Sequence, residues 1–475
     1  MNRKGLLIAF GSFILFTTLF QFSSPNLADG DTFFYIRQAW RHRTENLLDE
    51  SFPWFQFSII KDLSVSLWYG FFILLIPFTL FPDLIFGAKI AGVLFAAATL
   101  FIYFFVAQRH KLRAPFLWTA LFFFSAPNIL FRFLMVRMQL VSLGLCVLLY
   151  SFLIRGSFWP ILFATAGIVW IHANFAWVPF LLAGVVSLTK FFSEKRIDWQ
   201  SPLAVLTGFL GGWLLRPGPI SAAKLFFVQI IQQSLVKQAG APILFGTENF
   251  PLSLQTLLRN FSPLLLLWMA AMVFLGWFLV KKFSINSKEE KNILWSSLIL
   301  STAFFVLTMF VARRAYDFWA AFGIILAAAV STYLVKALPQ AKQKNLNLFA
   351  VIFVAVILAV AIPVSASKTK VSLEKRGYKP NQLRETASWL EENSHKGDLV
   401  FNPYWPRTSQ LFFWNQKNYY LNGLDPIFAY TYSPNLYWKT HYFIEDLVNE
   451  KICGAPACTQ SMLEDTYEVL KNEFG

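Results

Sequence analysis

The sequence predicts an all-α polytopic membrane domain followed by a small α/β domain. Hydrophobic residues make up 56% of the 475 residues and charged residues only 14%, far from the composition of soluble proteins. Apolar runs that approach the roughly 20 residues needed to cross a bilayer recur about a dozen times up to Val364 and then stop. The chain therefore divides into a membrane domain, 1–364, and a tail, 365–475, whose mixed composition is that of a water-soluble domain.

The first apolar run, 6–22, is expected to be a retained span rather than a cleaved signal peptide. Arg3 and Lys4 precede it, as in a signal peptide, but the run is longer than the usual ~7 to 15 apolar residues. Residues 26–28, Asn-Leu-Ala, also match a small-x-small cleavage site poorly.

Lys and Arg collect in short clusters between apolar runs, which is typical of cytoplasmic loops of membrane proteins. The net charge of +15 therefore indicates membrane topology, and we expect no nucleic-acid partner. We expect a multi-pass protein of the cell membrane with a cytoplasmic amino end. The first loop, 23–63, and the tail are then extracytoplasmic. The clusters assigned to the cytoplasm are 3–4, 109–113, 190–196, 281–291 and 336–344.

Two neighbouring apolar runs, 64–81 and 83–107, cannot both cross if the basic clusters on either side of them share the cytoplasmic face. The first run is the shorter one and carries Trp68, Tyr69 and Pro77, so we expect it to lie along the outer face or dip into it. The prediction is then about eleven transmembrane helices plus juxtamembrane helices. The alternative is that the charge rule fails at one loop.

Two carboxylates in the first loop, Asp29 and Asp31, are the strongest catalytic candidates. Acids at a membrane boundary are costly to hold near low dielectric unless a cation, a proton or a substrate uses them. Either could be a general base, and Asp31 could also bind Mg²⁺ or Mn²⁺ if other oxygens completed the shell. The alternative is a solvated or helix-capping pair.

Arginines near the predicted outer boundary are candidates to bind phosphate. Arg313 and Arg314 follow an apolar run, and a guanidinium group binds phosphate oxygens bidentately while keeping its charge at depth. The alternative is contact with lipid head groups. Asp317 could neutralise one of the pair. Arg137 and Arg132 flank another outer boundary and could serve the same role.

Five more residues at this face are candidates for substrate binding. His172 and Asn174 could hydrogen-bond a sugar or phosphate, although a structural role for the histidine is an equal alternative, and no zinc site is expected there. The long loop after Arg216 could form a lid, and its acid Glu248 is an alternative base. The five residues are Arg37, His172, Asn174, Arg216 and Glu248.

The tail is predicted to contain a helix at 381–392, strands at 398–402 and 419–421, and later helices. Its Tyr and Trp clusters suit stacking on sugar rings or packing on the membrane domain, the latter being favoured. Cys453 and Cys458 form a lone pair, which indicates a local disulfide rather than a metal site.

The segment 29–37, Asp-Gly-Asp-Thr-Phe-Phe-Tyr-Ile-Arg, resembles the first-loop motif of oligosaccharyltransferase catalytic subunits, and Phe-Pro-Trp at 52–54 is similar to a Pro-Trp step in that loop. Residues 137–140 and 170–174 are similar to segments of dolichyl-phosphate-mannose-protein and aminoarabinose transferase-like members. In layout the chain resembles the GT-C superfamily of membrane glycosyltransferases. Residues 402–406 stand where oligosaccharyltransferases carry a Trp-Trp-Asp-type acceptor motif, so transfer to an Asn sequon is not expected.

The resemblance implies an enzyme that takes a hexose or pentose from a polyprenyl-phosphate or polyprenyl-diphosphate donor. The acceptor would be a lipid, a glycan or a protein at the extracytoplasmic face, with the paired acids near the acceptor and the arginines near the phosphate. The competing hypothesis is a non-catalytic transporter or flippase of lipid-linked glycans, in which these charges line a path. Transporters usually carry internal repeats, and the sequence shows none, which favours the enzyme.

Overall fold

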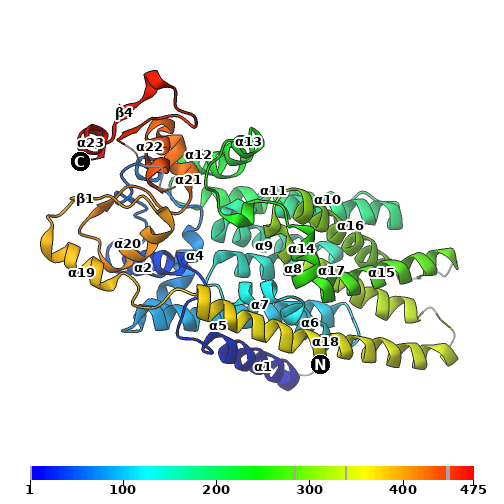
Figure 1. Cartoon of the computed structure of the whole chain (residues 1–475). Helices are drawn as coiled ribbons and strands as arrows, with labels where there is room; N and C mark the ends of the chain where they lie inside the picture. Colours follow the sequence, from blue (N-terminus) through cyan, green and yellow to red (C-terminus); the bar gives the residue numbers. More distant parts are fainter. Residues whose placement is uncertain are drawn as a thin grey trace.

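The computed structural model describes residues 3–281, 285, 287–336, 338, 340–444 and 450–474. A long helical bundle carries a small mixed region of helices and short strands at one end (Figure 1). The predicted fold class is therefore confirmed. Parts of the basic clusters predicted at 281–291 and 336–344 lie outside the described residues.

Eight helical segments in the described part of the chain are long and apolar enough to cross a membrane. Most of them are bounded by charged or polar residues, which marks where each leaves the apolar layer. The helices that form them are α1 (Arg3–Gln21), α5 (Leu84–Arg109), α8 (Met138–Arg155), α10 (Val178–Glu194), α15 (Ser262–Val280), α16 (Lys288–Phe310), α17 (Tyr316–Ala329) and α18 (Gln340–Arg376).

Two bent pairs raise the number of described spans to at most ten. Helix α6 (Pro115–Phe124) turns by 96° into α7 (Pro127–Phe133), and α11 (Gln200–Leu214) turns by 109° into the segment Pro219–Gln238. That segment consists of α12 (Pro219–Phe226), the π-helical η3 (Phe227–Gln232) and α13 (Gln233–Gln238).

One short helix explains why about eleven spans were expected and eight to ten are found. Helix α9 (Phe158–Ile171) has 14 residues, so its length of about 21 Å falls short of a hydrocarbon core of roughly 30 Å. The run predicted not to cross, 64–81, holds only α4 (Tyr69–Leu75) and η1 (Ile76–Leu80). It is likewise too short for a straight crossing, as expected.

The basic clusters assigned to one side of the membrane lie together at one end of the bundle. His110 contacts Glu289 at 2.8 Å, and Asn292 donates to Glu194 at 2.9 Å, which joins three of those segments. The protein is thus a multi-pass membrane protein, and three of the predicted basic clusters adjoin one another. Which end faces the cytoplasm stays a prediction.

The first loop folds into α2 (Asp31–Thr44) and α3 (Ile59–Leu63) and packs against the tail. Short elements at other connections keep the ends of the spans ordered. They are η2 (Ala173–Phe175), η4 (Thr247–Asn249), α14 (Leu254–Asn260), η5 (Arg313–Ala315) and η6 (Val330–Leu334).

The tail contains the helix and strands expected from its sequence, with slightly different limits. Strands β1 (Leu399–Val400) and β2 (Tyr419–Tyr420) pair in parallel, β3 (Lys451–Ile452) and β4 (Glu464–Asp465) pair antiparallel, and the predicted disulfide joins Cys453 to Cys458. The helices are α19 (Arg384–Asn393), η7 (Trp405–Arg407), α20 (Thr408–Trp414), α21 (Pro426–Tyr432), α22 (Pro434–Ile444), η8 (Gln460–Met462), α23 (Thr466–Val469) and η9 (Leu470–Phe474).

Backbone hydrogen bonds attach the tail to the first loop. Tyr420 N–H donates to the Trp54 carbonyl at 2.7 Å, and Gln56 N–H donates to the Tyr420 carbonyl at 2.9 Å, so the first loop continues the β1–β2 ladder. Leu27 and Tyr378 form an isolated bridge at the end of α18. These ladders hold the first loop, and the acids that it carries, between the bundle and the tail.

Two hydrophobic cores build the molecule. One lies inside the bundle around α17, which is almost wholly buried and includes Trp319 at its centre. The other joins α2, α4 and the tail through contacts between aromatic rings, such as the tilted pair Phe34 and Phe412. The candidate site lies where these two cores meet.

Candidate active site

Asp29 and Asp31 both bind one arginine, Arg137, which the sequence places 106 residues or more away. The Arg137 Nε and Nη2 atoms donate to the two oxygens of Asp29 at 2.5 and 2.6 Å, and Nη2 also donates to Asp31 Oδ2 at 2.7 Å. Parallel bonds of this kind fix the geometry of a carboxylate as well as its charge. The alternative of a helix-capping role is not what the structure shows, because Gly30 is the N-cap and the Asp31 side chain binds Arg137.

Glu248 and Arg314 complete the group from two other segments. Arg314 Nη2 donates to Glu248 Oε1 at 2.9 Å, and the same oxygen lies 3.8 Å from Arg137 Nη1. We call these five residues, Asp29, Asp31, Arg137, Glu248 and Arg314, the acid–arginine cluster. The carboxylates outnumber the guanidinium groups in it, so a proton or an incoming cation is favoured there.

The five side chains come from helix ends and loops rather than from the middle of spans. Asp29 follows α1, Asp31 begins α2, Arg137 is the N-cap of α8, Glu248 lies in η4 and Arg314 lies in η5. Such ends leave backbone groups unpaired and meet water, so charges can be held there at lower cost than inside a span.

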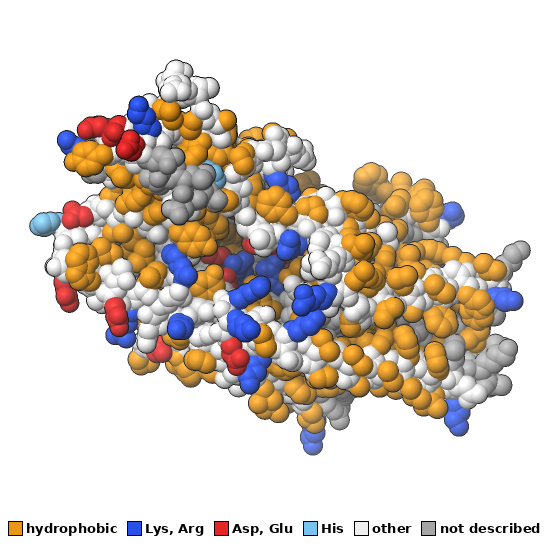
Figure 2. Space-filling model, viewed as in Figure 1, with side chains coloured by type: hydrophobic (Ala, Val, Ile, Leu, Met, Phe, Trp, Pro, Cys, Tyr) orange, Lys and Arg blue, Asp and Glu red, His pale blue; other side chains and the backbone are white. Residues whose placement is uncertain are grey.

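Exposure falls from the rim of the cluster to its base. The Asp29 side chain is 7% exposed and that of Arg137 is 14% exposed, whereas Asp31 reaches 27% and Arg314 reaches 34%. Figure 2 shows Lys and Arg gathered around the middle of one face, between the tail and the apolar surface of the bundle, with acidic groups recessed among them. A molecule arriving from solvent meets Asp31, Glu248 and Arg314 first.

The three acids differ in their readiness to hold a proton. Burial raises the pKa of Asp31 to about 7; Arg137 opposes this shift and the negative charge of Asp29 adds to it. Burial also opposes ionisation of Glu248, but the Arg314 and Arg137 guanidinium groups hold the pKa of Glu248 well below its usual range. Asp31 can therefore exchange a proton near neutral pH, whereas Glu248 is a weak proton acceptor.

Gly30, between the two acids, is required by close packing. A Cβ atom at this position would lie 2.8 Å from a ring carbon of Tyr378, closer than real Cβ atoms come. The Tyr378 backbone in turn is held by the bridge to Leu27. A side chain at residue 30 would therefore displace either the Tyr378 ring or the loop that positions both carboxylates.

Several predicted residues lie outside the cluster and contact the protein itself. The Arg37 guanidinium donates to the Phe413 carbonyl at 2.8 and 2.5 Å, which ties α2 to the tail, and Arg216 donates to the Val169 carbonyl at 2.9 Å. Arg313 contributes its backbone N–H to the Phe250 carbonyl. Their roles as substrate contacts stay predictions.

His172 and Asn174 lie near the cluster without joining it. Asn174 donates to Gln229 at 2.9 Å, and the buried His172 ring packs on Phe175 within electrostatic reach of Arg137. Neither side chain has a described contact with an acid of the cluster.

Asp317 pairs with Arg132 at 3.4 Å and lies within electrostatic reach of Arg314, so its direct ion pair is not with either member of the Arg313–Arg314 pair. Asp317 lies in the first turn of α17, and Arg132 at the end of α7 is its direct partner. Sequence spacing alone did not reveal this arrangement.

A tail residue near the cluster was missed. Asp425 caps α21, accepting a bond from Ile427 N–H at 3.2 Å, and lies within electrostatic reach of Arg314 and Glu248. Burial raises the pKa of Asp425 to about 6, which the bond from Ile427 opposes. An Asp-Pro pair in a turn was the available signal, but it gives no indication of what the turn faces.

The donor set present does not fit a divalent ion. Among the described residues, no group of three His, Cys, Asp or Glu side chains is arranged to hold a metal. Arg137 stands between Asp29 and Asp31, where a shared cation would have to bind, and it uses both oxygens of Asp29. Binding of Mg²⁺ or Mn²⁺ by Asp31 stays untested, and the contacts of Arg137 do not favour it.

An apolar groove of about 1030 Å³ opens between α1, α6 and α18. It runs along the bundle and reaches Ser23, Thr369 and Lys370. Phe20, in the groove wall, packs against a small apolar group formed by Ala28, Leu134 and Leu373, and Ala28 directly precedes Asp29 in the chain.

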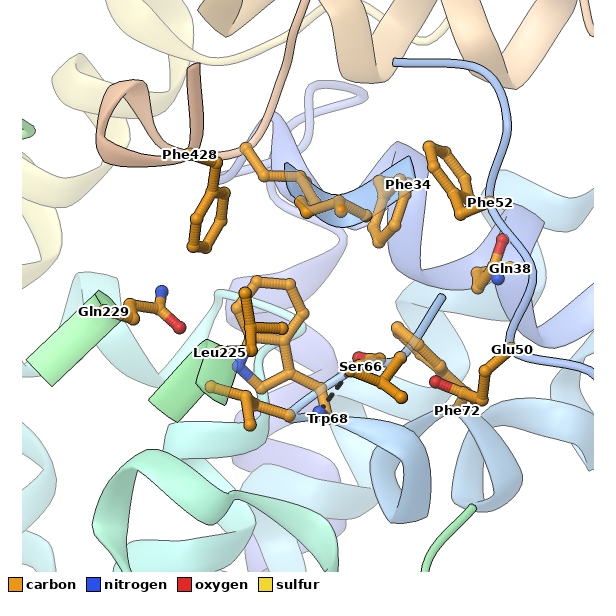
Figure 3. Close-up of a pocket in the computed structure, with 14 residues that line it drawn as sticks. Phe34, Gln38, Glu50, Phe52, Ser66, Trp68, Phe72, Leu225, Gln229 and Phe428 are labelled. Atoms are coloured by element: carbon orange, nitrogen blue, oxygen red, sulfur yellow. Dashed lines mark hydrogen bonds between the residues drawn. The ribbon is translucent and has the colours of Figure 1, made fainter. Parts of the chain in front are cut away.

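A second cavity, between α2, α12 and the tail, is much smaller (Figure 3). Its space of about 20 Å³ suits a single water molecule. In Figure 3 the side chains of Phe34, Trp68 and Phe428 surround the opening, with Gln38, Glu50 and Gln229 at its edges. The cavity is too small for a sugar, so we place the candidate site at the acid–arginine cluster.

No model of a known protein family and no curated protein sequence matches this chain.

Proposed function

We propose that this protein is a membrane glycosyltransferase of the GT-C type, which moves a sugar from a polyprenyl-linked phosphate or diphosphate donor to an acceptor at the extracytoplasmic face. The observation that carries the proposal is the convergence of three carboxylates and two guanidinium groups at one end of a membrane bundle that also contains an apolar groove. Acid for the acceptor, positive charge for the phosphate and an apolar path for the lipid are what such a reaction requires.

Asp31 is the proposed general base. It is the more exposed acid of the pair, and its pKa of about 7 suits proton transfer near neutral pH. As the acceptor oxygen bonds to the anomeric carbon, the bond from that carbon to the phosphate oxygen breaks, and the acceptor proton passes to Asp31.

Asp29 is the proposed positioning residue. Both of its oxygens are bound by Arg137, so it fixes the guanidinium plane that also contacts Asp31. Arg314, at the open rim, is the proposed contact for the departing phosphate, since its only described acidic partner, Glu248, can be exchanged for phosphate oxygens.

A transporter or flippase would place paired charges along the path through the bilayer, at the middle of the spans. The cluster residues lie at helix ends, which supports surface chemistry instead. The two functions also differ in product, because only a transferase consumes the sugar–phosphate bond.

The test is transfer by purified protein in liposomes, using a panel of polyprenyl-linked sugars carrying a radioactive label. Asp31→Asn should lower kcat by about 100-fold or more, the usual contribution of a general base, and Asp29→Asn should also lower it. Asp62→Asn, an exposed acid in the same loop, is the matched control and should keep full activity. Full activity of Asp31→Asn, or translocation of intact lipid-linked sugar without release of polyprenyl phosphate, would overturn the proposal.

A further inference from the structure

The segment Pro219–Gln238 exposes an apolar face that nothing in the described chain covers. Ile220, Phe227, Ile231 and Leu235 follow one another at helical spacing and are between 42% and 76% exposed. The opposite face, with Leu225 and Val228, is buried against the core that α2, α4 and the tail share. The segment therefore presents apolar side chains on both sides, one set buried in the protein and one set facing outward.

This face continues the lipid-facing surface of α11. Leu206, Leu210 and Leu214 on α11 are exposed, and Leu215 extends the same apolar surface to the bend. The chain then turns by 109°, so the next helix runs nearly at right angles to α11. If α11 crosses the bilayer, that direction lies along the membrane plane. A surface that is continuous with a membrane-embedded surface is itself in contact with lipid.

The polar residues of the segment suit phospholipid head groups. Over 219–238 the sequence contains Lys224 and Lys237 but neither Asp nor Glu. Lys224 is exposed on the outward side, where a long side chain can extend its ammonium group to lipid phosphates. This combination of one apolar face and basic polar positions is typical of interfacial helices.

Lys237, at the end of the segment, connects it to the acid–arginine cluster. Its Nζ donates to the Asn249 carbonyl at 2.7 Å and to the Val311 carbonyl at 3.1 Å. Asn249 directly follows Glu248, which pairs with Arg314 at 2.9 Å and lies 3.8 Å from Arg137. The hydrogen bonds of Lys237 therefore connect the end of this segment to the residue next to Glu248.

We infer that Pro219–Gln238 is an interfacial helix seated on the lipid leaflet at the cluster end of the bundle, and that through Lys237 it holds Glu248 in the cluster. The partner is the bilayer surface itself. The inference does not depend on which reaction the cluster performs.

Spin labels on introduced cysteines test the seating of the helix in liposomes of phosphatidylcholine with phosphatidylglycerol. In a Cys146→Ala background, which removes the buried free thiol and leaves the disulfide intact, labels at Phe227→Cys and Ile231→Cys should be accessible to oxygen and shielded from a water-soluble nickel chelate. Their depth should correspond to the head-group boundary. A label at Tyr467→Cys, an exposed aromatic residue of the tail, is the control and should show the reverse accessibility. Nickel access at Ile231→Cys equal to that at Tyr467→Cys, or a depth at the bilayer centre, would overturn the inference.

A label at Thr247→Cys, next to Glu248, tests the linkage independently of activity. Lys237→Met should narrow its spectrum, a sign of increased mobility, whereas Lys237→Arg should keep the spectrum of the parent protein because it can still donate to carbonyl oxygens. Lys224→Met, on the lipid side of the same helix, is the matched control and should leave the Thr247 label unchanged. An unchanged spectrum in Lys237→Met would show that the helix does not position Glu248.

Discussion

Replacement of Arg137 by Met tests the geometry of the cluster without reference to any substrate. Arg137 makes three hydrogen bonds to Asp29 and Asp31 and is only 14% exposed. Met has a similar length but no charge, so the variant leaves the carboxylates of Asp29 and Asp31 close together without the guanidinium group that both of them bind. That arrangement is costly because each acid has lost its compensating charge and remains partly shielded from water.

The expected loss is about 3 kcal/mol in the free energy of unfolding. Removing one partner of a buried ion pair usually costs about 3 to 5 kcal/mol. The lower end applies here because Asp31, with a pKa of about 7, can take up a proton and relieve the repulsion. The free energy of unfolding of Arg137→Lys should lie between those of the parent protein and Arg137→Met, since an ammonium group cannot make the parallel bonds to Asp29.

Unfolding in mixed micelles, followed by circular dichroism as the fraction of denaturing detergent rises, gives the free energy. The double variant Arg137→Met with Asp29→Asn should recover most of the loss, because it removes the uncompensated charge together with the cation. Arg196→Met, at an exposed arginine, is the control and should stay within about 0.5 kcal/mol of the parent. A single variant as stable as the parent, or a double variant no better than the single, would refute the reasoning.

Three further predictions concern pH, metals and the tail. Asp31 must be ionised to accept a proton, so kcat/KM should fall about tenfold per pH unit below about pH 7; a profile flat down to pH 5 would contradict this. Transfer should persist in EDTA because Arg137 already supplies the cation between Asp29 and Asp31, and loss of activity restored by Mg²⁺ would show the opposite. Cys453→Ser with Cys458→Ser, which opens a short loop, should lower the tail's stability by about 2 kcal/mol while transfer is retained, as measured by thermal unfolding and by the transfer assay.

Much of the fold could be predicted because its causes are local. Apolar length predicted the spans, and the lone pair Cys453 and Cys458 predicted their disulfide. The last long helix, α18, continues to Arg376, beyond the boundary predicted at 364, because polar residues extend the helix past its apolar part. The number of spans was less certain because α9 is helical and apolar but short, a feature that depends on how neighbouring helices pack around it.

The sequence indicated which residues belong to the candidate site better than it indicated which of them pair with one another. Assigning residues to one side of the membrane correctly grouped Asp29 and Asp31 with Arg137 and Arg314. It could not separate these from Arg37, because an arginine that binds a backbone carbonyl has the same sequence signature as one that binds a substrate. Which acid pairs with which arginine depends on the directions of side chains at the helix ends. Those directions depend on how the helices pack, which the sequence does not show.

Asp29 and Asp31 lie in different environments, from which we expect different roles for the two acids. Asp29 accepts bonds from Arg137 on both oxygens and lies at the base of the cluster, so its charge is already satisfied. Asp31 shares the same arginine through one oxygen, lies closer to solvent, and has the raised pKa. When two carboxylates are held by one guanidinium group, the acid with fewer bonds is the one that gains most from taking a proton. Asn substitution at both positions removes the same charge, so the two variants separate these roles: Asp29→Asn should weaken the hold on Arg137 and lower stability, whereas Asp31→Asn should lower transfer with little loss of stability.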